Sequence, residues 1–212
     1  MKVLLQRRVL YIAIINRIED TLPVCEALLA GGLDILEVPL RTSCALASIT
    51  AIRRTFPQMH VGAGTVLSTD QLKQAIDAGA TFAVAPGLNE KVVNAARDLN
   101  IPFVPGVMTP TEADRAIEFG CFIQKLFPAS ILGGPAMLKA LASPFAHTGV
   151  KFIPMGGVSQ ANAAEYLSMS ATAAIGGTWL ADRKLIAEKN WARITELTKE
   201  VMTLAATVKP QD

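Results

Sequence analysis

Short apolar runs alternate along the chain with alanine-rich stretches of helical periodicity. The runs recur at roughly 20–30 residues, the length of one strand–helix unit, and no linker interrupts the series. They begin near Val9, Asp34, His60, Thr81, Ile101, Cys121, Lys151 and Ala171. This pattern predicts eight buried strands, each followed by a helix.

Glycines and capping residues mark the ends of the expected helices. Ala30-Gly31-Gly32, Ala78-Gly79-Ala80 and Phe119-Gly120-Cys121 each place glycine where a helix must stop. Thr109-Pro110-Thr111-Glu112 has the pattern of a capping box with proline at the first helical position, and Ser68-Thr69-Asp70-Gln71 is a second candidate. These signals place a loop after each strand and before each helix.

The eight units predict an α/β fold, namely a single (β/α)8 TIM barrel over residues 1–212, although that fold usually needs about 250 residues. An open doubly wound sheet is the alternative. It would be supported by a G-x-G-x-x-G turn after the first strand. The stretch Asn16-Arg17-Ile18-Glu19-Asp20 stands there instead, which favours the barrel.

Composition and charge narrow the possible functions. Hydrophobic residues make up 51% of the sequence and charged residues 18%, which excludes a disordered chain. The net charge of +2 gives no electrostatic reason to expect nucleic acid as a partner. No apolar run approaches the ~20 residues of a membrane span, so we expect no membrane partner. The surplus apolar surface predicts contacts between subunits.

The N-terminus has some features of a signal peptide. Lys2, Arg7 and Arg8 precede the apolar run from Val9 to Ile15. A small-residue cleavage site does not follow it. We therefore interpret the run as a buried strand and expect a cytoplasmic protein.

Cysteine and histidine are scarce. The three cysteines show no C-x-x-C spacing, which argues against a disulfide framework and a thiolate zinc site. His60 and His147 are the two histidines, too few for a histidine-rich metal site and a weak basis for a Ser-His or Cys-His nucleophile. We expect neither a metal nor a cofactor.

In a (β/α)8 barrel, chemistry takes place where the strands end and the βα loops begin. Side chains alternate along a strand, so Glu37 and Arg41 share one face of the second run with Ile35 and Pro39. An unpaired buried carboxylate is costly. Glu37 is therefore either paired with a base such as Arg41 for structural reasons, or a proton-transfer group. In the second case Arg41 is free to bind a substrate anion.

Lys125 lies in the sixth apolar run with the parity of Ile123 and Phe127. Lysine is almost never fully buried without a partner. Burial disfavours a charged amine, and a neutral amine is a nucleophile that can form a Schiff base with a ketone. The alternative is a lysine that reaches solvent or pairs with Glu37 for structure.

Three further runs carry candidate binding residues. Thr65 ends the third run and could bond either a ligand or a loop. Gly156-Gly157 and Gly176-Gly177 follow the last two runs, where barrels commonly bind phosphate, and Thr178 adds a hydroxyl. Met155 has inward parity just before the first glycine pair.

This combination suits carbon–carbon cleavage of a phosphorylated keto acid. Arg41 and Thr65 would bind the substrate carboxylate, since arginine can do so with two hydrogen bonds. Lys125 would attack the ketone, and Glu37 would transfer protons.

At these residues the sequence resembles the 2-keto-3-deoxy-6-phosphogluconate (KDPG) aldolases, a class I family that includes 4-hydroxy-2-oxoglutarate (KHG) aldolase and 2-keto-3-deoxy-6-phosphogalactonate aldolase. The resemblance covers almost the whole chain. The matching stretches are Gly31-Gly32-Leu33-Asp34-Ile35-Leu36-Glu37-Val38-Pro39-Leu40-Arg41-Thr42, Val61-Gly62-Ala63-Gly64-Thr65-Val66-Leu67, Pro86-Gly87-Leu88, Ile101-Pro102-Phe103-Val104-Pro105-Gly106, Lys125-Leu126-Phe127-Pro128-Ala129 and Gly156-Gly157-Val158-Ser159.

The resemblance implies a metal-free (β/α)8 homotrimer that releases pyruvate from KDPG and from 4-hydroxy-2-oxoglutarate. It implies that Lys125 is the Schiff-base lysine and Glu37 the general acid/base. The substrate-binding residues predicted with it are Arg41, Thr65, Pro86, Phe127, Met155, Gly156, Gly157, Gly177 and Thr178.

The sequence departs from the gluconate-type pattern at three places. Met155 stands where those members usually have threonine, Ala129-Ser130 where they often have a glutamate, and Pro39 is closer to the galactonate type. A galactonate-configured substrate is therefore the first alternative.

Other function classes are separated by single features. A phosphosugar isomerase or epimerase on the same barrel has no need of an inward Lys125, and a non-catalytic barrel would tolerate Lys125→Met. A metal-dependent aldolase would need a ligand cluster.

Overall fold

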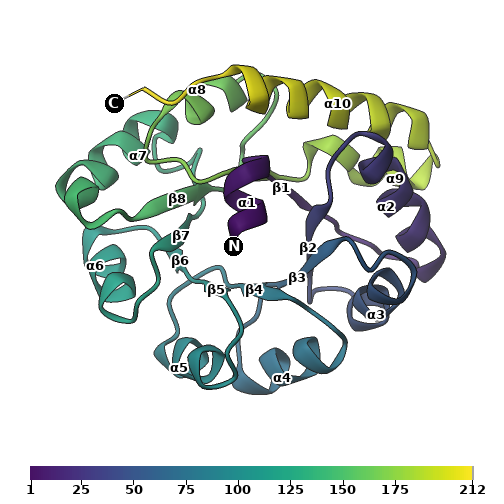
Figure 1. The fold of residues 1–212 in the computed structure, drawn as a ribbon, viewed down its shortest axis with the longest axis horizontal. Helices are drawn as coiled ribbons and strands as arrows, with labels where there is room; N and C mark the ends of the chain where they lie inside the picture. The colour runs from purple at the N-terminus through teal and green to yellow at the C-terminus, as the bar shows by residue number, and fades with distance from the viewer. Residues whose placement is uncertain (212) are drawn as a thin grey trace.

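The computed structural model describes residues 1–211 as a ring of short parallel strands surrounded by helices (Figure 1). The last residue of the predicted domain, Asp212, lies outside the described residues. The strands are β1 (Val9–Ile12), β2 (Ile35–Pro39), β3 (His60–Gly64), β4 (Phe82–Val84), β5 (Phe103–Val104), β6 (Gly106–Val107), β7 (Ile123–Leu126), β8 (Lys151–Pro154) and β9 (Ile175–Gly177). The predicted alternation of strands and helices is confirmed.

A helix or a short 3-10 segment follows each strand except β5, which leads to β6, and one helix that the sequence pattern did not predict precedes β1. The α-helices are α1 (Lys2–Arg7), α2 (Thr21–Ala30), α3 (Ala45–Thr55), α4 (Thr69–Asp77), α5 (Glu90–Asp98), α6 (Pro110–Glu118), α7 (Gly134–Ala142), α8 (Ala163–Ser168), α9 (Arg183–Ala187) and α10 (Trp191–Thr207). Short 3-10 segments are η1 (Ile18–Asp20), η2 (Ser143–Thr148) and η3 (Trp179–Ala181). None of the helices within residues 1–211 is long and apolar enough to span a membrane.

The fifth predicted strand is divided by Pro105. The strand order is β5-β4-β3-β2-β1-β9 in one sheet and β6-β7-β8 in the other, with every neighbouring pair parallel. Thus β5 pairs with β4 and β6 pairs with β7. Proline lacks an N–H donor, but its carbonyl accepts from the N–H of Lys125 at 2.8 Å and so ties β7 to this junction.

The last strand begins later than predicted. The apolar run expected to start near Ala171 contributes an isolated bridge between Thr172 and Phe152 of β8, and β9 begins at Ile175. That bridge and the pairing of β9 with β1 close the ring on this side. The curled parallel sheet confirms the predicted (β/α)8 barrel class.

The caps follow the predicted chemistry, with one difference. Thr109 and Glu112 form a complete capping box at the start of α6. At α4, Ser68 accepts from the N–H of Gln71, but the side chain of Gln71 accepts from the N–H of Leu67 instead of Ser68. The second cap is therefore shifted by one residue, and it still satisfies two free backbone donors.

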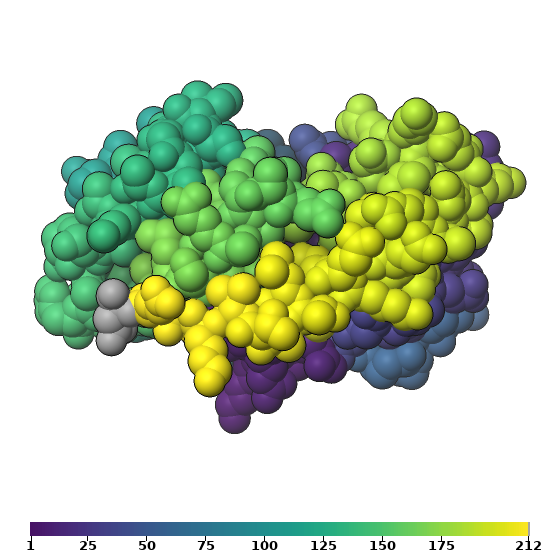
Figure 2. All heavy atoms as spheres, turned by 90° about the horizontal axis from the view of Figure 1, so that it is seen from above, coloured from purple at the N-terminus to yellow at the C-terminus, as the bar shows by residue number. Residues whose placement is uncertain are grey.

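The N-terminal and C-terminal helices meet on one side of the barrel. Figure 2 shows α10 running across this side, with α1 projecting beneath it. The Arg8 guanidinium donates to the carbonyls of Ala205 and Val208 at 3.0 and 2.6 Å, and also to that of Leu167. Arg8 thereby fastens the ends of α8 and α10 to the start of β1.

Candidate active site

A cavity of about 330 Å³ opens where the strands end. All the predicted site residues line it, although they come from six βα units spread along the chain. They are Glu37, Arg41, Thr65, Pro86, Lys125, Phe127, Met155, Gly156, Gly157, Gly177 and Thr178. Ile12 and Val158, which sequence reasoning did not select, also line the cavity. Ile12 pairs in register with Glu37, so its parity could have placed it there.

Glu37 lies in the floor of this cavity with 1% of its surface exposed. Its Oε2 atom makes no hydrogen bond within residues 1–211. Burial raises the pKa of this carboxyl, while the charges of Lys125 and Arg41 act to lower it. No ion pair joins Glu37 to either base in the described part of the chain. The geometry therefore gives no support to a purely structural ion pair.

Two glycines, Gly62 and Gly64, occupy the inward face of β3 beside the cavity. A Cβ atom at Gly64 would overlap the carboxyl group of Glu37, and one at Gly62 would overlap the ring of Phe82. Val61 and Ala63 therefore face the helices. Strict alternation would place Thr65 with them, but Thr65 has a left-handed backbone with φ 55°, which turns it into the cavity.

Lys125 points into the cavity from the middle of β7 with 6% of its surface exposed. Its Nζ atom lies 5.0 Å from the centroid of the Phe127 ring, and its backbone pairs in register with Gly106 and Ile153. A Cβ atom at Gly106 would overlap the backbone of Pro86. The close approach at Gly106 thus brings Pro86 to the cavity wall near the lysine.

Arg41 stands at the mouth of the cavity just beyond β2, with its side chain exposed. Its guanidinium forms no ion pair within residues 1–211. An exposed arginine without a protein partner at the opening of a cavity can bind an incoming carboxylate.

Two glycine loops form the opposite side. Gly156 and Gly157 have φ +85° and +83°, a conformation that other residues rarely adopt. Met155, fully buried, lies just before them, and a Cβ atom at Gly176 would be 2.6 Å from its Cε methyl. The indole of Trp179 packs directly on Gly177. This side therefore presents backbone amides beside an apolar thioether.

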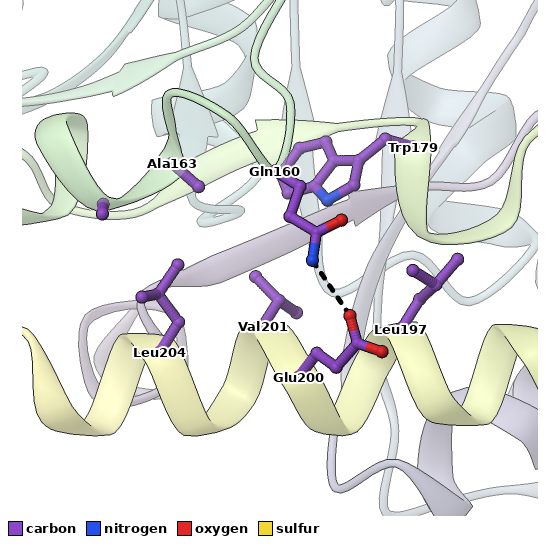
Figure 3. Close-up of a pocket in the computed structure, with 8 residues that line it drawn as sticks. Gln160, Ala163, Trp179, Leu197, Glu200, Val201 and Leu204 are labelled. Atoms are coloured by element: carbon purple, nitrogen blue, oxygen red, sulfur yellow. Dashed lines mark hydrogen bonds between the residues drawn. The ribbon is translucent and has the colours of Figure 1, made fainter.

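A second recess of about 210 Å³ lies outside the barrel, between α8, η3 and α10. Figure 3 shows its apolar lining, with the Nε2 of Gln160 donating to Glu200 at 3.0 Å across it. It shares Trp179 with the wall behind Gly177 but contains none of the predicted site residues. The groups suited to catalysis thus gather in the first cavity.

The described structure offers no cluster of metal ligands, and two of its three thiols are buried and poorly reactive. No group of three or more His, Cys, Asp or Glu residues within residues 1–211 is arranged to hold a metal ion. Cys25 and Cys121 are buried, and burial raises the pKa of their thiols to about 12 and about 11. Thiols with such pKa values are poor nucleophiles at neutral pH.

A parallel barrel in which a buried amine and a carboxyl share one cavity has the architecture of a lyase of the Schiff-base, or class I, aldolase type. The chain belongs to the KDPG and KHG aldolase family, whose model matches residues 1–197.

Named relatives agree with this assignment. A 2-dehydro-3-deoxy-phosphogluconate aldolase of Treponema pallidum is 40% identical over 197 residues, which are 93% of each chain. A KHG/KDPG aldolase of Escherichia coli is 40% identical over 191 residues, 90% of this chain and 89% of the relative. The crystal structure of a KDPG aldolase from Legionella pneumophila, with pyruvate captured as a covalent carbinolamine intermediate, superimposes with a TM-score of 0.90 at 39% identity. That match covers 94% of this chain and 96% of the other.

Proposed function

We propose that the protein cleaves KDPG to pyruvate and glyceraldehyde 3-phosphate, and 4-hydroxy-2-oxoglutarate to pyruvate and glyoxylate. The observation that carries this proposal is the placement of Lys125, buried in the same cavity as Glu37, whose Oε2 has no hydrogen-bond partner in the described part of the chain. The substrates named for the relatives support the choice of keto acid.

Lys125 is the covalent nucleophile in this proposal. Its neutral Nζ attacks the substrate ketone to give a carbinolamine, which loses water to form an iminium. The iminium accepts the electron pair of the bond between C3 and C4, so that bond breaks. The aldehyde leaves and an enamine remains on the lysine. Protonation of C3 and return of water then release pyruvate and the free amine.

Glu37 transfers the protons that these steps require. It donates one to the departing water, accepts one from the C4 hydroxyl as the bond breaks, returns one to C3, and regains one from the water that hydrolyses the final iminium. Burial raises the pKa of its carboxyl against the lowering effect of Lys125 and Arg41, which favours the protonated form that donates the first proton. The unpaired Oε2 faces no competing protein donor within residues 1–211.

The remaining residues bind the two ends of the substrate. Arg41 and Thr65 hold the carboxylate next to the ketone, and Pro86 and Phe127 form the walls beside Lys125. The amides at Gly156, Gly157 and Gly177, with the Thr178 hydroxyl, hold the phosphate. These groups all line the one cavity, which supports binding of a substrate with an anion at each end.

A galactonate-configured substrate is the second candidate. Met155 leaves this candidate open, because its buried thioether lines the cavity and cannot donate a hydrogen bond that would select the gluconate configuration.

The assembly and location complete the proposal. Exposed apolar side chains in the loops at the open end of the barrel, Leu67 and Ile131 among them, support subunit contacts near the site, and the homotrimer follows from the family resemblance. We place the enzyme in the cytoplasm and in sugar-acid breakdown of the Entner–Doudoroff type.

Borohydride trapping tests the central claim. Incubation with pyruvate and borohydride should leave one stable adduct, located on Lys125 by peptide mass mapping. Lys125→Met removes the amine at similar volume and should abolish both the adduct and cleavage. An adduct on another lysine, or full cleavage activity in Lys125→Met, would exclude the proposed mechanism.

A further inference from the structure

The side chain of Asn162, just before α8, bridges two points of the loop that follows β8. Its Nδ2 donates to the carbonyl of Gly157 at 3.0 Å, and its Oδ1 accepts from the N–H of Ser159 at 2.8 Å. A carbonyl can only accept and a backbone N–H can only donate, so these two partners fix the orientation of the amide. Asn162 makes no capping bond to α8, and both its bonds serve the loop.

Ser130 holds the same loop from the other side. Its N–H donates to the carbonyl of Gly156 at 2.9 Å, and its side chain fills the space where a Cβ of Gly157 would be. Ser130 and Asn162 therefore anchor the two successive carbonyls of the glycine turn to the protein.

The anchored carbonyls determine where the amides of the turn point. In a planar trans peptide the N–H is directed opposite to the carbonyl of the preceding residue. Ser130 thus aims the N–H of Gly157, and Asn162 aims that of Val158. Neither N–H has a protein acceptor within residues 1–211, and both residues line the cavity.

We propose that Asn162 is a positioning residue for recognition of the substrate phosphate. By holding the carbonyl of Gly157, it keeps the Val158 N–H directed at the phosphate. It thereby favours a phosphorylated keto acid over 4-hydroxy-2-oxoglutarate, which ends in a carboxylate closer to the reacting carbon. The inference rests on the proposed function, whose phosphate end it describes in greater detail.

Two variants of Asn162 separate its effects. Asn162→Ala removes both bonds. Asn162→Asp keeps an acceptor for the Ser159 N–H, cannot donate to Gly157, and adds a negative charge near the phosphate. Loss of a hydrogen bond in the anion site should raise KM for KDPG roughly fivefold to tenfold in Asn162→Ala, with kcat changed less than about twofold. Asn162→Asp should raise KM for KDPG further, because its added negative charge repels the phosphate.

The substrate without phosphate provides the internal comparison. Cleavage of 4-hydroxy-2-oxoglutarate should stay within about twofold of wild type in both variants. Gln160→Ala is the matched control, because it removes an amide from the same loop whose bond goes to Glu200 and not to the glycine turn. Gln160→Ala should leave kcat and KM unchanged for both substrates.

Binding of inorganic phosphate, followed by phosphorus NMR titration, gives a readout independent of catalysis. Its dissociation constant should rise in Asn162→Ala and Asn162→Asp but not in Gln160→Ala. An equal loss on both substrates, or unchanged phosphate binding in a folded Asn162→Asp, would overturn the proposal. Pyruvate trapping on Lys125 should persist in every variant. Absence of trapping in the wild type would instead overturn the proposed function, while the phosphate titration would still decide the role of Asn162.

Discussion

The carboxyl group of Glu37 on β2 fills the space beside Gly64 on β3 that any other residue would need for its side chain. The two strands are adjacent and parallel, and Gly64 pairs in register with Pro39, two residues beyond Glu37. The absence of a Cβ atom at position 64 therefore permits the position of the proposed proton-transfer group.

Gly64→Ala should displace that carboxyl without changing its chemistry. The new methyl group would overlap it, so Glu37 must change rotamer or β2 must shift. We expect kcat to fall at least about tenfold, since correctly placed acid–base groups contribute about 10²–10⁴-fold. Steady-state kinetics on KDPG would measure this.

Gly87→Ala is the control for Gly64→Ala, because a Cβ atom there would meet no atom of the described residues within 4 Å. It should retain wild-type kcat and thermal stability. If Gly64→Ala were fully active, the observed position of the Glu37 carboxyl would not matter for turnover.

Glu37→Gln keeps the shape of the side chain and removes its ability to transfer protons. Turnover should fall by about 10²–10⁴-fold, and the barrel should still fold because Glu37 has no ion-pair partner to lose within residues 1–211. Circular dichroism and single-turnover kinetics would check the two halves of this prediction. A variant that is unfolded at room temperature would favour the structural role for Glu37.

The same substitution should change how stability depends on pH. Burial raises the pKa of Glu37 in the folded protein, so between about pH 4.3 and that raised value the folded state binds more protons than the unfolded chain. The contribution of Glu37 to the free energy of unfolding is thus present at low pH and lost as pH rises. Glutamine does not titrate, so the stability of Glu37→Gln relative to wild type should increase from pH 5 to pH 8. Urea unfolding at several pH values would measure it, and a difference independent of pH would contradict the raised pKa.

The strand–helix order was predictable because buried parallel strands are short apolar runs and their helices carry their own caps. The position of Glu37 and Lys125 in the cavity was predictable for a related reason: each is a charged residue with inward parity in such an apolar run. The division of the fifth strand was not predictable. A proline at position 105 is compatible with one continuous strand or with two short ones, and only the pairing of β5 with β4 and of β6 with β7 shows which is formed.

Other features depend on backbone conformation that residue patterns do not encode. Alternation groups Thr65 with Val61 and Ala63, which the structure turns toward the helices, and only the positive φ of Thr65 brings it to the cavity. Asn162 is a polar residue in a polar loop, so no sequence signal separates it from Gln160. Its relation to the glycine turn appears only with the hydrogen bonds of the folded loop.

Met155 should set the preference between the two substrate configurations. Its thioether lies in the cavity just before the phosphate-binding glycines and touches Gly176, and it cannot donate a hydrogen bond to a substrate hydroxyl. One missing hydrogen bond is worth roughly 0.5–1.5 kcal/mol, or at most about a tenfold preference. The wild type should therefore cleave gluconate- and galactonate-configured substrates with similar kcat/KM.

Met155→Thr supplies a hydroxyl and should shift the ratio toward the gluconate form, with pyruvate trapping on Lys125 intact. Gly176→Ala, which would press the thioether into the cavity, should instead raise KM for both configurations and leave the ratio unchanged. If the wild type already preferred the gluconate form by several hundredfold, the discrimination would have to come from residues other than Met155, because one hydrogen bond cannot supply it.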